Sequence, residues 1–390
     1  QDVFSQGEVR SLLNRYGKSL TLLKIDDINN VGSMKLRVRS LIESLKFEAK
    51  EATEVKPFIK PRRFEVGDNE RRKILAPFFT EYLSPLFPAA FKWAGYDMES
   101  LPLSNADSND VGLKYSNNEV CYPATLIVGD LIKALQSGKY DLDKVAVAVT
   151  QLGQCRAANY PPLIRKAIVD AGFEQVPVIG IGGTDNIEDQ PGFKLNLIKA
   201  APLVIYATMY GDWLSIFYHA IAVRERNKGE ARKLRDLYLE KAKPLVEKGD
   251  TKGLLKLTGE AARAFNEVPI YEDRVYPKAG ITGEIFLKFN PYAHRYVPDW
   301  LMEHGVEVVP SAVHNFFFRA FVNYKFNKEN FVKRFKVPPL VIDMAYNLIR
   351  KVVKKIEAEA SQFRYYKPEQ DIKTISEYAK DVISLSAQFG

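Results

Sequence analysis

The sequence predicts an α/β protein with two lobes built on parallel sheets, a helical region between them and a helical C-terminal part. Two observations carry this fold class. In the first half, short apolar runs at 144–150 and 176–181 alternate with a helical pattern at 163–171, and such alternation is typical of parallel sheets. Residues 195–268 then contain no clear strand pattern, before one returns at 278–286.

The first lobe can be followed element by element. Lys73–Phe79 is a short apolar run that suits a buried strand, and the apolar residues of Ala124–Leu135 recur on one helical face. The run at 144–150 is β-branched and bounded by polar residues, so it predicts a strand. The helix at 163–171 is followed by Gly172, a common residue after a helix end.

The second half is mostly helical. An apolar helical pattern covers Leu195–Val223, and two charged helical patterns follow between Glu230 and Phe265. A helical pattern ends over Trp300–Gly305, and a strand is predicted over Val306–Val309. A long helical pattern runs from Leu340 to about Ala360.

We divide the chain into four parts. Residues 1–50 form a loosely attached helical segment, and 51–194, which opens with a charged linker, form the lobe that carries both cysteines. Residues 195–270 form the helical region, and 271–390 form the second lobe. Because the chain starts without a methionine and stops at Phe389-Gly390, we expect a piece of a longer protein, truncated in its second lobe.

The composition excludes several classes of protein. The 46% hydrophobic and 27% charged fractions exclude disordered and collagen-like chains. Two cysteines in 390 residues exclude a disulfide scaffold and a cysteine-rich zinc module. No apolar run is long enough to span a membrane, and the N-terminus has no signal-peptide pattern. We therefore expect the cytoplasm and no membrane partner.

The net charge of +8 is spread along the chain, and its densest basic stretch is Lys56–Arg63. A nucleic-acid groove would pair such charge with aromatic stacking positions or a known module, and neither is present. The stretch suits a solvated linker face, with attraction to an anionic ligand or an acidic partner as the alternative. We expect no nucleic-acid partner.

Each cysteine stands where a predicted helix begins. Cys121 directly precedes Tyr122-Pro123, and proline is favoured in the first turn of a helix. Cys155 follows the strand at 144–150, at the carboxyl end where open α/β sheets bind ligands. The start of a helix favours a thiolate, as does the neighbouring Arg156. One sheet edge could present both thiols as metal ligands, or one of them as a nucleophile.

The alternative is that both thiols are structural. A lone cysteine is most often a small buried hydrophobe, and the spacing between Cys121 and Cys155 matches no metal motif. A disulfide is disfavoured in a reducing compartment.

Among the four histidines, His294 is the best acid/base candidate because it follows a turn near Glu284. His219 lies within an apolar helical pattern, which predicts a packed core residue. His304 stands at a helix end, where the dipole suits a cation. His314 flanks a run of three phenylalanines, so we expect packing there.

Motifs for phosphate binding and serine hydrolysis are incomplete. Gly180–Thr184 follows a predicted strand but lacks the dinucleotide pattern and the lysine of a P-loop. Its backbone N–H groups could still hold an anion, although a plain turn is favoured. No Gly-x-Ser-x-Gly elbow is present.

Around both cysteines the sequence resembles a known family. The segments KYSNNEVCYPATLIVGD (114–130) and QLGQCRAANY (151–160) are similar to the C-terminal part of large acyl-CoA dehydratase activase-related proteins. That part is similar to the iron–sulfur component of 2-hydroxyacyl-CoA dehydratases. The resemblance runs from about residue 35 to the end, and it includes Pro191–Lys194, Met209–Asp212, Gly280–Pro291, Phe363–Tyr366 and Ile383–Gly390.

The resemblance implies two flavodoxin- or Rossmann-like lobes around a [4Fe–4S] cluster held by three cysteines. An ATP-dependent activase, as a domain or a separate protein, injects one electron. The acyl-CoA is thereby reduced to a ketyl radical that expels a hydroxyl group, while related proteins with double-cubane clusters reduce other small molecules. The implied ligands are Cys121 and Cys155, and the helix starts and loop around Tyr122, Arg156 and Asn159 would shape the site. Within this hypothesis we assign Glu284 and His294 as acid/base or substrate-facing residues.

Some family features are missing. The third cysteine of the family lies beyond a sequence like Gln388-Phe-Gly390, the ATPase segments are absent, and Leu152–Cys155 is shorter than the usual motif. A non-catalytic docking or scaffold module of a large activase polypeptide is therefore the alternative, and a nucleotide-binding protein using Gly180–Thr184 is a weaker one. An oligomer is compatible with each.

Overall fold

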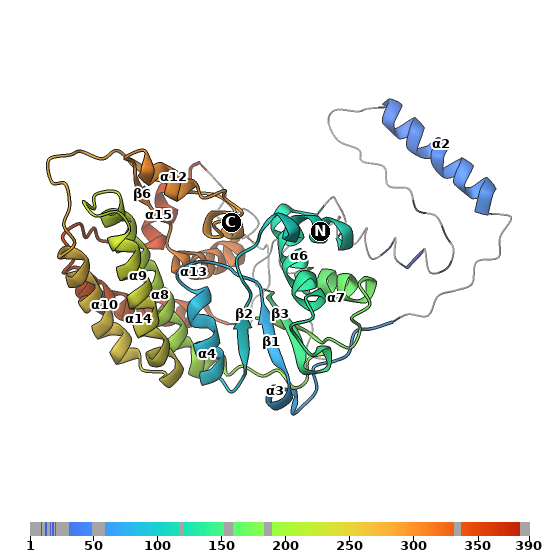
Figure 1. Ribbon diagram of the computed structural model, residues 1–390, viewed down its shortest axis with the longest axis horizontal. Helices are drawn as coiled ribbons and strands as arrows, with labels where there is room; N and C mark the ends of the chain where they lie inside the picture. Colours follow the sequence, from blue (N-terminus) through green and yellow to red (C-terminus); the bar gives the residue numbers. More distant parts are fainter. Residues whose placement is uncertain are drawn as a thin grey trace.

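The structure is a computed structural model of the 390-residue chain (Figure 1). Apart from a few single residues before Val31, it describes residues 31–48, 59–116, 120–151, 159–182, 189–330 and 337–382.

A four-stranded parallel sheet lies at the centre of the first half (Figure 1). Along the sheet the strand order is β2-β1-β3-β4, and Ile74 of β1 lies between Met98 of β2 and Ala146 of β3. The strands are buried on both faces, which explains their nearly continuous apolar sequences. Their bounds are β1 Lys73–Ala76, β2 Met98–Ser100, β3 Val145–Thr150 and β4 Val178–Ile181.

One face of this sheet is covered by helices α6 (Tyr122–Gln136) and α7 (Tyr160–Asp170), which pack on alternate strand residues such as Leu75 and Val147. Helix α5 (Ala106–Tyr115) lies on α6.

The α5–α6 contact is close because glycines line it. A Cβ atom on Gly129 would lie 1.6 Å from the carbonyl oxygen of Ser108, and one on Gly112 would lie 2.0 Å from that of Thr125. The two helix backbones can approach this far only without side chains at these positions.

The opposite face carries helix α4 (Phe87–Trp93) and the segment before β1. Phe64 is fully buried there, and its N–H donates to the carbonyl oxygen of Asp189. The end of the predicted linker is therefore held on the sheet by an aromatic residue and a backbone hydrogen bond, while the basic side chains of Lys60, Arg62 and Arg63 are exposed, as a solvated face requires. Short helix α3 (Asp68–Arg71) follows, and Arg72 is buried with its guanidinium 2.7 Å from the carbonyl oxygen of Val145.

The second half is organised around helix α8 (Leu197–Ala222), which is apolar on nearly all sides. Helices α9 (Glu230–Lys248), α10 (Thr251–Asn266) and α14 (Pro339–Ala360) pack around it.

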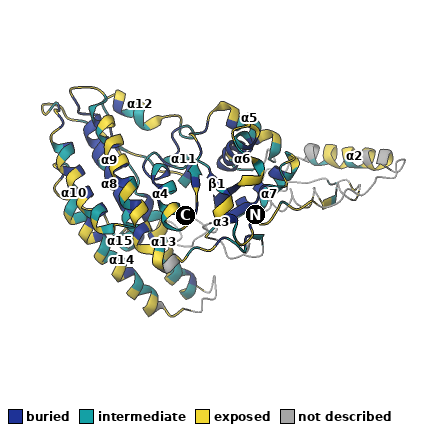
Figure 2. Cartoon of the chain, turned by 60° about the horizontal axis from the view of Figure 1, so that its bottom comes forward, coloured by how far each residue is buried: buried dark blue, intermediate teal, exposed yellow. Residues whose placement is uncertain are grey.

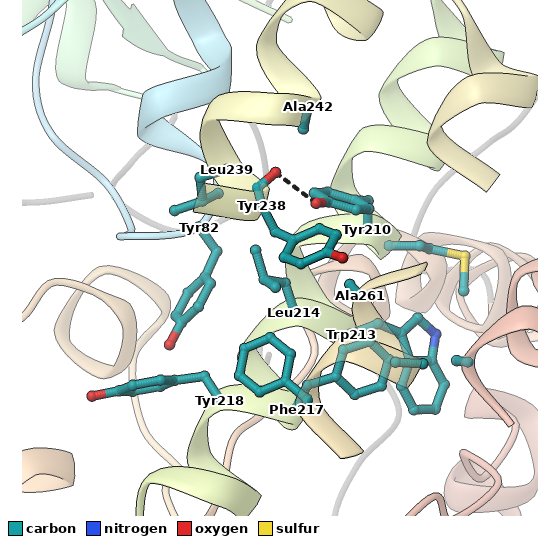
Figure 3. Close-up of a cluster of buried hydrophobic side chains, with 14 of the residues drawn as sticks. Tyr82, Tyr210, Trp213, Leu214, Phe217, Tyr218, Tyr238, Leu239, Ala242 and Ala261 are labelled. Atoms are coloured by element: carbon teal, nitrogen blue, oxygen red, sulfur yellow. Dashed lines mark hydrogen bonds between the residues drawn. The ribbon is translucent and has the colours of Figure 1, made fainter. Parts of the chain in front are cut away.

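The core between these helices is rich in aromatic residues (Figure 3). The hydroxyl of Tyr210 donates to the carbonyl oxygen of Tyr238 at 2.7 Å, and Trp213 stacks on Tyr366 with ring centroids 5.4 Å apart. Each buried aromatic ring contributes a large apolar area to the packing of these helices.

Strands β5 (Lys278–Gly280) and β6 (Glu307–Val309) pair in parallel as a separate two-stranded sheet. Helices α11 (Ile285–Phe289) and α12 (Val297–Glu303) lie between them in the chain. After β6 the chain is helical, with α13 (Val313–Glu329), α14 and α15 (Ile372–Ala379).

The α/β class with a parallel sheet is confirmed, and so are the predicted strands at the positions of β1, β3, β4, β5 and β6. The sequence prediction missed β2 and α5. Helix α2 (Val31–Glu48) forms where a helix is expected in the N-terminal segment, and none of its described side chains is buried (Figure 2). No helix in the described ranges is long and apolar enough to cross a membrane.

Candidate functional site

The thiol of Cys121 lies at the start of α6, as predicted from Pro123. Cys121 is the N-cap residue, it is half-buried, and its Sγ lies 3.6 Å from the hydroxyl oxygen of Tyr160. Tyr160 is the first residue of α7. The starts of two helices therefore meet at this thiol, and helix N-termini favour negatively charged groups.

The strand order gives the sheet a defined ligand edge. The chain passes from β1 to β2 on one side and then to β3 on the other side of β1, and open α/β sheets bind ligands outside such a switch point. Cys155 and Arg156 follow β3, but both lie outside the described residues. Asn159 is half-buried at the N-cap of α7, where its side chain makes no capping hydrogen bond.

The second half of the chain contacts this sheet through α11. Phe286 is buried in the same apolar cluster as α6 and α7, and the rings of Phe289 and Phe79 are 5.7 Å apart. The amide of Asn290 donates to the carbonyl oxygen of Phe78 at 3.3 Å. The loop after β1 is thus held against the segment that carries Glu284 and His294.

Tyr122 lies beside the same segment. Its side chain is exposed, and burial of its hydroxyl together with the neighbouring Tyr292 raises the pKa of Tyr122. Cys121 and Asn159 are the N-cap residues of α6 and α7, and Tyr122 is the first residue of α6.

A cleft separates the loop after β1 from the β5–β6 part of the chain. Its empty volume, including space open to solvent, is about 560 Å³. Helix α8 and the start of α13 complete its walls. The side chains with titratable groups that line it are those of Glu81, Tyr82, Asp212, His219, Lys288 and His294.

His294, the predicted acid/base residue, lines this cleft, whereas Glu284 does not. Burial lowers the pKa of His294, so the ring is neutral at pH 7. Its Nδ1 atom is buried and has no hydrogen-bond partner among the described residues. Glu284 is exposed at the N-cap of α11, where its carboxylate accepts the N–H of Leu287 at 2.9 Å. In this structure Glu284 has a capping role.

His219 is a buried residue, as expected, and it also lines the cleft. Burial lowers its pKa to about 4. Its Nδ1 lies 2.8 Å from the carbonyl oxygen of Ser215. A carbonyl oxygen only accepts, so Nδ1 carries the proton and Nε2 of the neutral ring is an acceptor.

Sequence reasoning missed a buried charge network behind the cleft. The Nδ1 of His314 lies 2.8 Å from Oδ2 of Asp212, and its Nε2 lies 2.9 Å from Oε2 of Glu369. Asp212 also accepts the backbone N–H groups of Val313 and His314. His314 is buried and packs on Phe318, as predicted, but it also carries this charge network, which the prediction did not include.

The network holds one proton firmly. Burial alone would lower the pKa of His314, but the hydrogen bonds to Asp212 and Glu369 and their charges outweigh this and raise it to about 10. Burial also raises the pKa of Asp212. Because the pKa values of His314 and Asp212 are both raised, this pair keeps its proton at neutral pH, and the proton lies on the imidazole.

Within the residues that the structure describes, no group of three or more His, Cys, Asp or Glu side chains is placed to hold a metal ion. Comparison with protein-family models, curated proteins and solved structures gave no match. Function must therefore be inferred from the residues themselves.

Proposed function

We propose that this chain is the iron–sulfur part of a reductase or dehydratase of the 2-hydroxyacyl-CoA dehydratase type. It would take part in the ATP-activated one-electron reduction of an acyl-CoA or of another small molecule that is hard to reduce. The observation that carries the proposal is the position of Cys121. A half-buried thiol at the start of α6 contacts the start of α7, beside the ligand edge of a parallel sheet.

The second proposed ligand is within reach of the first by chain length. Cys155 precedes Tyr160 by five residues, and five residues span at most about 17 Å. Tyr160 itself contacts Cys121. The segment that contains Cys155 also directly follows β3, next to β1 at the switch point.

The donor chemistry suits an iron–sulfur cluster, which thiolates hold and which supplies a one-electron reductant when bound. In this proposal Cys121 and Cys155 hold a [4Fe–4S] cluster, and a third cysteine comes from outside this chain. Tyr122, Arg156 and Asn159 surround it. The partner that delivers the electron is an ATP-dependent activase.

The strand order also supports the proposed lobes. The order β2-β1-β3-β4 equals the first four positions of the flavodoxin-like order 2-1-3-4-5. In the proposal the β5–β6 part belongs to a second, flavodoxin-like lobe. His294, neutral and in the cleft between the two parts, is then the proposed acid/base residue, with Glu284 held next to α11 as a second candidate.

Metal analysis of cysteine variants tests the proposal. The protein is prepared and reconstituted without oxygen, and its iron, sulfide and EPR spectrum are measured. We expect iron and sulfide in equal amounts in the wild-type protein and at least about a tenfold lower content in Cys121→Ser and Cys155→Ser, because each removes a ligand.

A matched control is Ser137→Ala, at the opposite end of α6, which should keep the wild-type iron content. An iron-free wild-type protein after reconstitution would overturn the proposal. Full iron and electron transfer in the double cysteine variant would instead favour structural thiols in a scaffold module.

A further inference from the structure

We infer that the cleft between the loop after β1 and the β5–β6 part binds a small organic monocarboxylate with an apolar tail, and that Lys288 supplies its counter-charge. This inference concerns residues other than the two cysteines and needs no cluster. It begins with a cation that the folded chain leaves without an anion.

Lys288 extends from α11 into the cleft wall and is half-buried. Its ammonium group makes no ion pair or hydrogen bond with any described residue, and it lies over the ring of Phe289, whose centroid is 5.1 Å from Nζ. Burial and the nearby Arg319 lower the pKa of Lys288. A partly desolvated cation without a partner is unfavourable, and an anion placed in the cleft relieves this.

The carboxylates near Lys288 are already engaged. Asp212 accepts hydrogen bonds from two backbone N–H groups and from His314, whose single positive charge it shares with Glu369. Glu284 caps its own helix, α11. Glu81, in another wall of the cleft, lies 3.1 Å from the guanidinium of Arg235. None of the three forms an ion pair with Lys288.

The other walls decide what kind of anion fits. They include apolar surface from Leu83, Ile281, Phe289, Val308 and Val313. The histidines in the cleft are neutral, since burial lowers the pKa values of both His219 and His294. One unpaired cation beside apolar walls suits a single negative charge on an apolar chain. A phosphate dianion would need more positive charge.

Binding can be measured on the metal-free chain, so a failure here is separate from a failure of the cluster proposal. The probes are hexanoate, hexan-1-ol with the same chain but no charge, and inorganic phosphate. Calorimetry and thermal unfolding report binding, since a ligand of the folded state raises the unfolding temperature. We expect binding of hexanoate and neither of the other two.

The variants are Lys288→Met, Lys288→Arg and the control Lys252→Met, which changes an exposed lysine on α10. Lys288→Met should weaken hexanoate binding by at least about tenfold because the counter-charge is lost, and Lys288→Arg and Lys252→Met should keep it. Equal hexanoate affinity of Lys288→Met and wild type would overturn the inference. So would hexanol binding as tight as that of hexanoate, or a preference for phosphate.

A second measurement needs no variant. A carboxylate bound in the cleft lies near the imidazole of His294 and favours its protonated form. Titration of His294 by NMR should therefore show a higher pKa with saturating hexanoate than with hexanol. An unchanged pKa, together with unchanged unfolding temperatures, would place the carboxylate elsewhere and refute the inference.

Discussion

Replacing His314 by glutamine removes the buried positive charge that joins Asp212 to Glu369. The pKa of His314 is about 10 in the folded chain and about 6.5 in an unfolded one. At 1.36 kcal/mol per pH unit this difference corresponds to about 4.8 kcal/mol. At pH 7, three pH units below the folded pKa, about 4 kcal/mol of this remains. We take this as an upper bound and expect His314→Gln to lose about 3–4 kcal/mol of unfolding free energy at pH 7, as when one partner of a buried ion pair is removed.

The pH dependence provides a second signature. The folded chain keeps a proton on His314 that the unfolded chain releases above about pH 6.5. The stabilisation from this group is therefore complete below about pH 6.5 and is lost as the pH rises towards 10. Glutamine does not titrate, so the difference in unfolding free energy between wild type and variant should become smaller as the pH rises across this range.

Urea unfolding followed by tryptophan fluorescence and circular dichroism, at several pH values from 6 to 10, measures both effects. The control is His304→Gln, because His304 is exposed and its ring hydrogen-bonds and stacks with Trp300, in its own helix, away from the charge network. Two results would refute the reasoning. One is a His314→Gln stability within about 0.5 kcal/mol of the control, and the other is a difference that does not change with pH.

Two further predictions concern the packing of α5 on α6 and the loss of stability at acid pH. Gly129→Ala should destabilise the chain by about 3 kcal/mol, because the added Cβ would meet the Ser108 carbonyl oxygen. The control Gly280→Ala, with nothing within 4 Å of the added atom, should leave the unfolding free energy almost unchanged. Similar urea midpoints for the two variants would disprove the close α5–α6 contact. His219 has a folded pKa of about 4, so the unfolded chain binds its proton first as the pH falls. The unfolding free energy should fall by up to about 3.4 kcal/mol as the pH drops from about 6.5 to 4, and His219→Gln should abolish this part of the loss. The same fall in unfolding free energy in the variant would contradict this prediction.

The strands that the sequence predicted are those with a local pattern. The run that forms β3, Val145–Thr150, is β-branched and bounded by polar residues, and Pro123 and Gly172 mark helix ends where the structure has them. Strand β2 (Met98–Ser100) is three residues long and has no periodic pattern. It forms because the neighbouring β1 supplies its hydrogen bonds, which no local pattern shows.

In the candidate site, too, the features that depend on neighbouring residues were predictable and those that depend on the fold were not. The helix-start position of Cys121 depends on adjacent residues and was predictable. The pairing of His314 with Asp212 joins residues 102 positions apart and exists only because α13 begins against α8. The phenylalanines next to His314 indicated packing and hid the charge. Lys288 likewise becomes notable only after the fold has engaged the nearby carboxylates elsewhere. Shared ligation by Cys121 and Cys155 stays a prediction.

Helix α8 is synthesised well before one of the helices that cover it. Pro339, the first residue of α14, follows Ala222, the last residue of α8, by 117 positions, which corresponds to roughly 6–23 s of translation. Tyr366 and Phe363, the rings that Trp213 and Phe217 contact in the folded core, follow α14 in the chain and are synthesised later still. Helices α9 and α10 emerge first and cover part of α8. The interval before α14 appears is therefore when the nascent chain exposes its most apolar surface and is most prone to aggregate.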